Sequence, residues 1–479
     1  MNKLILISLF LLPFSLLSQE CNCLNNFEWV KKTFEENDAG FEHIMAIKGE
    51  TAYSLHNKAI LEKIKASKTL DECRPVLFEW LKFFRSGHIA IRPIEEENAI
   101  STVSNQFADW ETYIVDIEKF KRYLNSKTTQ NFEGIWKSGA YTIGVKKDSD
   151  SYVGFIIDSK NNTWTQDQVK FKISEGKGVL NSIYYMGDHS AVQSNTIQLL
   201  GKNYLQIGDI QLVREYPVIE EQSVYSEYFS MIQAKTPYIK QLNDHTIYFR
   251  IPSFHHNHKK LIDSVIVANK DQILSTENLI IDIRNGTGGS DHSYSEILPL
   301  IYTNPIRIVG LEFLSTSINN QRMIEFATNP EKYALDEETA KFVKKSIDKL
   351  EKEPGKFVNL NDDIVSITEY DTIYKYPKRV GIIINKNNGS TDEQFLLAAK
   401  QSKKVKLFGT TTHGVLDISN MYFITSPCNE FELGYALSRS MRIPDLTIDE
   451  KGIQPDYFFD KSISIYEWTN QVNKILNEK

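Results

Sequence analysis

The sequence predicts an α/β protein, and three stretches of different periodicity predict how the chain is divided. Within residues 19–100, apolar residues recur at three- and four-residue steps, which predicts an N-terminal helical unit. Within residues 125–216, short runs alternate between apolar and polar, which predicts an inserted small antiparallel β-barrel or sandwich. Within residues 227–479, strands alternate with helices, which predicts an α/β core.

The first eighteen residues have the pattern of a secretory signal peptide. Asn2 and Lys3 precede an apolar run over residues 4–17, which is too short to span a bilayer. We therefore expect cleavage after Ser18 and an exported protein in the periplasm or outside the cell. A lipid anchor at Cys21 is the less favoured alternative, because Glu20 is a poor residue to precede an acylated cysteine.

Four cysteines follow the predicted cleavage site: Cys21, Cys23, Cys73 and Cys428. An exported compartment permits disulfides, but spacing alone does not give their connectivity. We expect Cys23 to pair with Cys73, since both lie in the N-terminal helical unit; the alternative is a free buried thiol. The chain has no C-x-x-C pair, so it supports neither a zinc knuckle nor a redox motif.

Length and charge exclude one class of function. The chain has 479 residues, enough for two or three domains with a sizeable core. Its net charge is −7, its pI is about 5.9, and it has no block rich in lysine and arginine. A nucleic-acid partner is therefore not expected.

A histidine lies where the helical unit ends. Gly87 is typical of the residue after a helix, and Ile89 and Ile91 alternate as a short strand. His88 thus lies on a helix-to-strand corner, and the pKa range of imidazole suits a general base. The more ordinary interpretation is a polar surface residue.

The middle of the chain predicts strands without helices between them. Six short strands are expected at residues 134–136, 141–145, 152–157, 169–173, 183–185 and 204–207. Polar turns such as residues 146–150 separate them. The interior of such a barrel could hold a ligand, although small barrels are usually filled by their own side chains.

A glycine-rich turn follows the predicted buried strand 279–283. Gly286, Gly288 and Gly289 allow the backbone to approach another group closely and to turn its N–H groups toward it. Their order matches neither the dinucleotide fingerprint nor a phosphate loop. The turn is therefore an oxyanion-binding loop or a plain tight turn.

Ser390 lies between the predicted strand 380–384 and a helix that begins at Thr391. At such a turn a side chain can be exposed while the helix N-terminus supplies free N–H groups and positive potential. This is suitable geometry for a nucleophile with an oxyanion site. The alternative is an ordinary helix cap, because Glu393 completes a capping box with Ser390.

Four motifs occur in a recognisable order. They are the glycine loop after residues 279–284, Ser-x-x-Glu at 390–393, Gly-x-x-Thr-x-Gly at 409–414 and Gly-Ile-x-Pro-Asp at 452–456. In this order the chain resembles the tail-specific (C-terminal processing) and tricorn-core serine peptidases. The resemblance implies a crotonase- or Clp-like α/β core, a polypeptide substrate and a peptidase activity that proceeds through an acyl-enzyme.

The resemblance also implies roles for individual residues. Ser390 matches the nucleophile, and the N–H groups of Thr391 and of Gly288 or Gly289 match the oxyanion hole. His88 is similar to the histidine that the tricorn-like branch takes from the end of its N-terminal helices.

Two further positions decide between the branches of this family. Asp449 lies where the tricorn-like branch has a glutamate that helps to position the base, so we expect it to fix the tautomer of the His88 ring and to stabilise the imidazolium. Val415 lies where the other branch has the lysine of a Ser-Lys dyad. The resemblance therefore favours a Ser390–His88–Asp449 mechanism.

Other histidines offer alternatives. His292 and His413 are rival bases, since both lie on loops that flank the expected site. Residues 255–258 contain three histidines, but adjacent histidines point in different directions and no carboxylate lies among them. We expect neither a metal nor a cofactor.

Two alternatives to a peptidase stay open. One is a catalytically silent protein that binds a peptide or a lipid on the same fold, and the other is an acyl hydrolase that does not cut peptides. The predicted β-barrel also takes the place of the PDZ domain of many relatives, so a preference for substrate C-termini is not implied.

Overall fold

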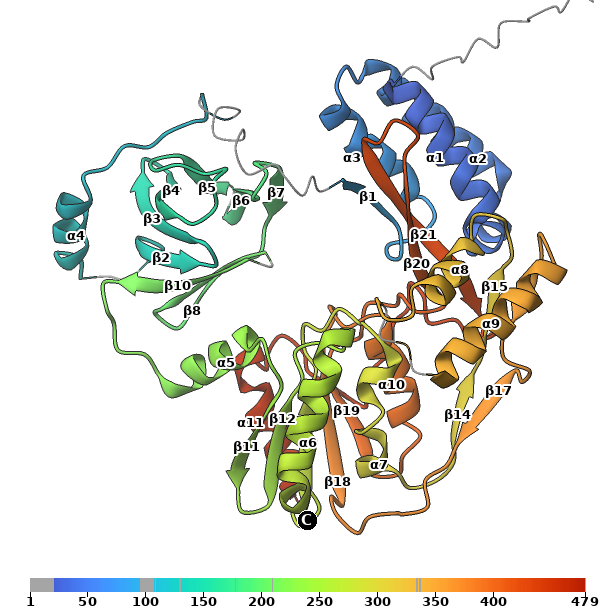
Figure 1. Ribbon diagram of the computed structural model, residues 1–479. Coiled ribbons are helices and arrows are strands. Elements are labelled where there is room, and N and C mark those ends of the chain that lie inside the picture. Colours follow the sequence, from blue (N-terminus) through green and yellow to red (C-terminus); the bar gives the residue numbers. More distant parts are fainter. Residues whose placement is uncertain are drawn as a thin grey trace, which may run out of the picture. The chain divides into compact units, whose positions relative to one another are not determined.

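The computed structural model describes residues 21–94, 107, 109–128, 131–176, 178–208, 210–332, 335 and 337–478. The predicted signal segment, residues 1–18, lies outside the described residues. The chain forms two compact units. The core unit comprises residues 1–95, 237–460 and 475–479, and the barrel unit comprises residues 96–236 and 461–474 (Figure 1).

Three helices begin the core unit: α1 (Cys23–Asn37), α2 (Phe41–Ala66) and α3 (Leu70–Leu81). The side chains of Asn22 and Thr69 cap α1 and α3 by accepting the N–H groups of Asn25 and Glu72, at 2.9 and 3.2 Å. The inner faces of the helices bury a cluster that includes Phe34. The helical unit predicted from periodicity is therefore present as three helices, of which α1 and α3 have side-chain caps.

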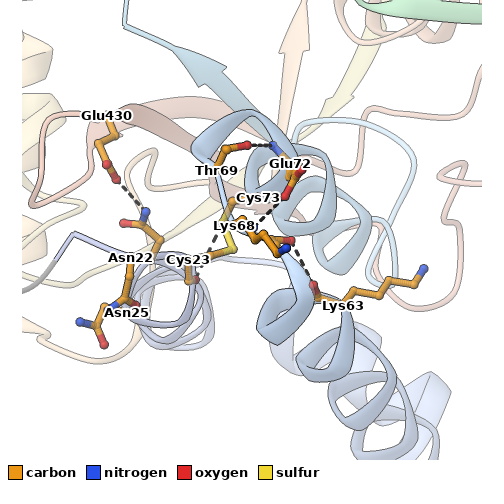
Figure 2. The surroundings of a disulfide bond; sticks show 11 residues. Asn22, Cys23, Asn25, Lys63, Lys68, Thr69, Glu72, Cys73 and Glu430 are labelled. Carbon is orange, nitrogen blue, oxygen red and sulfur yellow. Dashed lines mark hydrogen bonds between the residues drawn. A yellow bond between two sulfur atoms is a disulfide. The ribbon is translucent and has the colours of Figure 1, made fainter.

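Both disulfides of the described chain hold this helical segment. Cys23 pairs with Cys73 as predicted and joins α1 to α3 (Figure 2). Cys21 pairs with Cys428, which lies 407 residues further along the chain. The start of α1 is thereby fixed to a C-terminal loop of the same unit.

A six-stranded sheet forms the centre of the core unit, in the order β11 (Tyr238–Asn243), β12 (Thr246–Arg250), β13 (Asn278–Asp282), β18 (Arg379–Ile384), β19 (Val405–Gly409), β22 (Tyr457–Phe458). All its strands except β11 run parallel. Strands β12 and β13 are buried along their whole length, as expected for a parallel sheet covered on both faces. Three helices cover it: α6 (Lys259–Ile273), α7 (Leu298–Ile301) and α10 (Thr391–Ala399).

A second sheet joins the N-terminal segment to the C-terminal part of the core unit, because strands from both parts pair in it. Its antiparallel order is β1 (Ala90–Pro93), β21 (Phe431–Ser440), β15 (Leu311–Leu314), β16 (Phe357–Asn359), and β20 (Ile418–Thr425) also pairs with β21. In Figure 1, α1 to α3 lie beside the long hairpin β20–β21. The remaining elements of the unit are β14 (Ile306–Val309), β17 (Val365–Thr368), α8 (Gln321–Thr328) and α9 (Glu337–Lys352).

The barrel unit contains a nine-stranded antiparallel sheet in the order β7-β6-β5-β4-β3-β2-β10-β9-β8. Its strands are β2 (Gly134–Ser138), β3 (Tyr141–Asp148), β4 (Ser151–Ser159), β5 (Val169–Gly176), β6 (Val179–Tyr185), β7 (Ala191–Ser194), β8 (Ile197–Leu200), β9 (Tyr204–Ile207) and β10 (Ile210–Tyr216). The helices α4 (Ile117–Asn125), α5 (Ser223–Gln233) and most of α11 (Trp468–Asn477) also belong to this unit. Apolar side chains such as Trp136 and Phe171 pack together in the buried core of the barrel unit. The predicted antiparallel unit is present, with three strands (β7, β8 and β10) beyond the six expected.

Candidate active site

Ser390 lies on the turn between β18 and α10, as the sequence predicts. Its backbone has φ 56° and ψ −122°, a combination that L-residues other than glycine rarely adopt. Its side chain makes no capping hydrogen bond to α10, although it directly precedes the helix. Instead, Ser390 Oγ lies 3.2 Å from Nε2 of His88. The strained turn therefore presents the hydroxyl to an imidazole rather than to the helix.

Glu393, the expected partner in a capping box, interacts with the backbone of Ser390 and also holds a second loop. Its carboxylate accepts hydrogen bonds from Thr412 Oγ1 at 2.5 Å and from the N–H groups of Gly414 and Val415 at 2.7 and 2.9 Å. The side chain is fully buried. Glu393 thus fixes the loop 412–415 beside the turn that carries Ser390.

His88 lies between α3 and β1 with φ 53°. Its Nδ1 lies 2.6 Å from the carbonyl oxygen of Ile418. Because a carbonyl only accepts, Nδ1 carries the proton, and Nε2 of the neutral ring is left as an acceptor for the hydroxyl of Ser390. Burial lowers the pKa of His88 to about 4, so the ring is neutral at pH 7. This is the protonation state and the tautomer that a general base requires.

Arg85 fixes the corner that carries His88. Its guanidinium donates to the carbonyl oxygens of Gly87 and His88, both at 3.0 Å. It also forms a buried ion pair with Asp38, with Nη1 at 2.7 Å from Oδ1. Asp38 in turn accepts the N–H of Ala436 in β21 at 3.1 Å. The corner is therefore tied to the turn between α1 and α2 and to β21.

Asp449 does not occupy the position that the sequence predicts, beside the imidazole. Its Oδ1 accepts the N–H groups of Leu416 and Asp417, each at 2.6 Å, and its Oδ2 accepts that of Ile418 at 3.2 Å. The imidazole of His88, expected to contact Asp449, contacts the carbonyl oxygen of Ile418 instead. An aspartate is one methylene shorter than the glutamate implied by the resemblance, and the amides of residues 416–418 take up its oxygens.

Asp417, which sequence reasoning missed, completes a reciprocal arrangement with Asp449. Its Oδ2 accepts the N–H of Asp449 at 2.9 Å, and its Oδ1 accepts Nε of Arg442 at 2.9 Å. Each aspartate thus binds the backbone of the other. A single carboxylate within the apolar run 415–418 was the available signal, since a buried charge requires partners. We call Asp417, Asp449 and Arg442 the aspartate clasp.

The glycine loop after β13 lies against Ser390. A Cβ atom on Gly288 would be 2.8 Å from Cβ of Ser390 and 3.2 Å from the nitrogen of Thr391. A Cβ atom on Gly289 would be 2.2 Å from the carbonyl of Phe254. Both positions therefore exclude any side chain. Within the described residues, the N–H groups of Gly289 and Thr391 make no hydrogen bond to another backbone group, which leaves them available for an oxyanion.

Amide side chains and a buried carboxylate join this loop to the nucleophile turn. Asn388 Nδ2 donates to the carbonyl of Ile283 at 2.6 Å and to Oδ2 of Asp392 at 2.9 Å. Asn385 Nδ2 donates to Oδ1 of Asn285 at 2.7 Å. Burial raises the pKa of Asp392 to about 7. Asp392 and these asparagines, which sequence reasoning also missed, hold the ends of β13 and β18 in register.

The rival histidines do not contact Ser390. His413 is exposed, and its backbone N–H donates to the carbonyl of Asn388 at 2.8 Å. His292 is exposed in the short helix Asp291–Tyr294. Within the described residues, the imidazole that hydrogen-bonds Ser390 Oγ is that of His88.

Val415 fills the space beside the two reactive side chains. Its methyl groups would lie 2.6 Å from a Cβ atom on either Gly87 or Gly389. The position that could have supplied the amine of a Ser-Lys dyad is thus occupied by an apolar side chain that packs between the corner of His88 and the turn of Ser390. Among the described residues, no group of three or more potential ligands is placed to hold a metal ion, the run 255–258 included.

Comparison with known families assigns the segment that contains this turn. Residues 245–458 match the model of Peptidase family S41. This segment is a Peptidase family S41 domain. The family S41 domain extends from β12 to β22 and contains Ser390, so the chain is a serine-type peptidase that acts on polypeptides. His88 lies outside the matched segment.

Solved structures resemble the chain over nearly its whole length. Mature CPAF complexed with lactacystin is 12% identical and has a TM-score of 0.54, with 95% of this chain and 97% of that chain covered. A second structure of mature CPAF is 12% identical, with 95% and 96% covered and a TM-score of 0.51. The photosystem II D1 C-terminal processing protease is 11% identical, with 96% and 97% covered and a TM-score of 0.39. At 12% identity, the similarity to CPAF concerns the fold alone. No curated protein sequence matches.

Replacing Ser390 by glycine should stabilise the fold while removing the candidate nucleophile. Glycine adopts a positive φ without steric cost, so we expect Ser390→Gly to raise the free energy of unfolding by about 1 kcal/mol. Urea denaturation measures this change. Ser149→Gly is the matched control, since Ser149 also has a positive φ, 52°, but lies in an exposed turn of the barrel unit. A loss of stability in Ser390→Gly alone would show that the serine side chain supports the turn.

The aspartate clasp should make stability depend on pH. Burial, and then the charge of Asp417, raise the pKa of Asp449 from 3.8 to about 6. A raised pKa means that the folded chain favours the protonated carboxyl of Asp449. The contribution of Asp449 to the free energy of unfolding is therefore fully present below about pH 4 and is lost as the pH rises through about 6.

Urea denaturation of the wild type and of Asp449→Asn at several pH values tests this dependence. Asparagine does not titrate, so we expect the wild type to lose about 1–3 kcal/mol of stability relative to the variant between about pH 4 and pH 7. A difference between the two proteins that stays constant with pH would contradict the shift.

Proposed function

We propose that this peptidase forms an acyl-enzyme on Ser390, with His88 as its general base. The observation that carries the proposal is the distance of 3.2 Å between Ser390 Oγ and His88 Nε2, with Nδ1 of the same ring held by a carbonyl. A serine hydroxyl is a weak nucleophile at neutral pH and needs a base within hydrogen-bond reach.

In the first step, Ser390 Oγ attacks the carbonyl carbon of the peptide bond while its proton passes to Nε2 of His88. The N–H groups of Gly289 and Thr391 donate to the oxyanion of the tetrahedral intermediate. His88 then gives the proton to the leaving amine, and the acyl group stays on Ser390. A water molecule, activated by the same nitrogen, releases the acyl group as a carboxylic acid.

Asp449 enters this mechanism as a positioning residue. The partner of the imidazolium is the carbonyl dipole of Ile418, and the aspartate clasp holds the backbone that carries this carbonyl. The Ser390–His88–Asp449 mechanism is therefore retained in an indirect form. We also propose that the parallel sheet and its helices have the crotonase- or Clp-like fold implied by the family resemblance.

Substitution of the two candidate bases, His88 and His413, tests which of them activates Ser390. We expect His88→Ala and Ser390→Ala each to lower the turnover of an unfolded polypeptide substrate by about 10³-fold or more, and the double variant to be no worse, because members of a catalytic unit fail together. His413→Ala, the matched control, should stay within about ten-fold of the wild type. Steady-state kinetics decide between the two histidines. Loss of turnover in His413→Ala with activity kept in His88→Ala would reject His88 as the base.

We further propose that the protein is exported to the periplasm or beyond the cell. The signal pattern over residues 1–18 and the two disulfides support this location, because disulfides persist in oxidising compartments. The pairing of Cys21 with Cys428 also disfavours a lipid anchor, since acylation needs the free thiol. In the described part of the chain, no helix has the length and apolar character to cross a membrane.

Mass spectrometry of the protein from its natural source tests export. We expect a mature chain that begins near Gln19 and a mass that corresponds to two disulfides. An uncleaved Met1, or a diacylglycerol mass on Cys21, would contradict a free exported protein.

A further inference from the structure

A cavity of about 850 Å³ lies in the core unit and is separate from the residues that contact Ser390. Its walls come from α2, the segment 82–86, the residues 417–418 and the loop 443–451. Most of the exposed lining is apolar, from Ile44, Ile47, Phe84, Ile418, Ile443 and Pro444. Cavities of this size and character hold small molecules. The proposed mechanism uses Ile418 and the two aspartates of the aspartate clasp from its wall but assigns no ligand to the cavity.

The carboxylates of the cavity wall are already satisfied from within the protein. Asp417 binds Arg442, and Asp449 accepts three backbone N–H groups. Glu450 accepts the N–H and the hydroxyl of Ser86, at 3.0 and 2.9 Å. These carboxylates therefore already have hydrogen-bond donors within the protein.

Three lysines of the wall have no carboxylate partner among the described residues. Lys451 Nζ lies 3.0 Å from Thr447 Oγ1, and Lys82 Nζ lies 4.8 Å from the ring centre of Phe78. Lys48 donates to the carbonyl of Phe83. Within the described residues, none of the three forms an ion pair with a carboxylate. The cavity thus combines apolar walls with lysine ammonium groups that have no carboxylate partner, which favours an anionic head on an apolar body.

The loop 448–452 leaves no backbone donor for a peptide. Its N–H groups donate within the loop itself, to Asp417 or to Gly414. The backbone of α2 is interrupted beside the cavity at Gly49, which has φ 77° and ψ 157°. A peptide would therefore find no main-chain donor in this loop, whereas a hydrocarbon chain needs none.

We propose that this cavity binds a long-chain carboxylate: the aliphatic chain lies along the apolar wall, and the lysines hold the carboxylate. Two residues of the wall, Ile418 and Asp449, also hold the carbonyl that meets His88. A ligand in the cavity would therefore contact the support of the proposed base.

Isothermal titration calorimetry of the full chain with sodium dodecanoate, kept below the critical micelle concentration of the dodecanoate, tests the proposal. Ser390→Ala serves as the parent protein, so that binding is measured independently of catalysis. We expect one saturable site, with dodecan-1-ol at least about five-fold weaker, since it lacks the charge. Lys82→Ala and Lys451→Ala should each weaken dodecanoate about two- to five-fold, and the exposed control Lys65→Ala should not.

A second pair of variants tests the apolar wall. Ile47 lines the cavity and Leu55 does not, yet both belong to α2 and both are 65% exposed. Ile47→Asp should weaken dodecanoate by at least about ten-fold, and Leu55→Asp should leave it unchanged.

Three results would overturn the proposal. The first is the absence of saturable binding, and the second is an equal effect of Ile47→Asp and Leu55→Asp. The third is displacement of a fluorescent aliphatic probe by an apolar peptide but not by dodecanoate, which would make the cavity a peptide site.

Discussion

The hydrogen bond between Nδ1 of His88 and the carbonyl of Ile418 is the interaction on which the active site depends. It joins residues 330 positions apart and decides which nitrogen of the ring faces Ser390. Three links in the core unit keep the segment of His88 beside that of Ile418: the Cys21–Cys428 disulfide, the pairing of β1 with β21, and the hydrogen bond from the N–H of Ala436 to Asp38. The N-terminal helices thus act as a support that brings the base to a nucleophile on the C-terminal half.

A second constraint aligns the oxyanion donors with the nucleophile. Strands β13 and β18 are parallel neighbours, so the loops that follow them meet at the same edge of the sheet. Asp392 and Asn388 join these loops, and Gly288 has no room for a side chain beside Ser390. The proposed oxyanion donors are therefore backbone groups whose positions follow from sheet order.

Sequence reasoning succeeded where a feature is local and lost accuracy where it depends on distant contacts. The turn of Ser390, the glycine loop and the buried strands follow from periodicity and residue type. His88 came from the family resemblance, because its partner lies 302 residues away. Asp449 was predicted to lie beside the imidazole, but its carboxylate accepts the N–H groups of residues 416–418, and the course of that segment cannot be read from the sequence. The strands β7 and β8 were missed because each has four residues and mixes polar with apolar side chains.

The most direct test of this account is whether Ser390 becomes covalently modified. The native protein would be treated with a fluorophosphonate probe, digested and mapped by mass spectrometry, with His88→Ala treated in parallel. The account predicts one adduct, on Ser390, that forms far more slowly in His88→Ala. An unlabelled Ser390 in folded protein that still cuts its substrate, or an adduct on another residue, would contradict it.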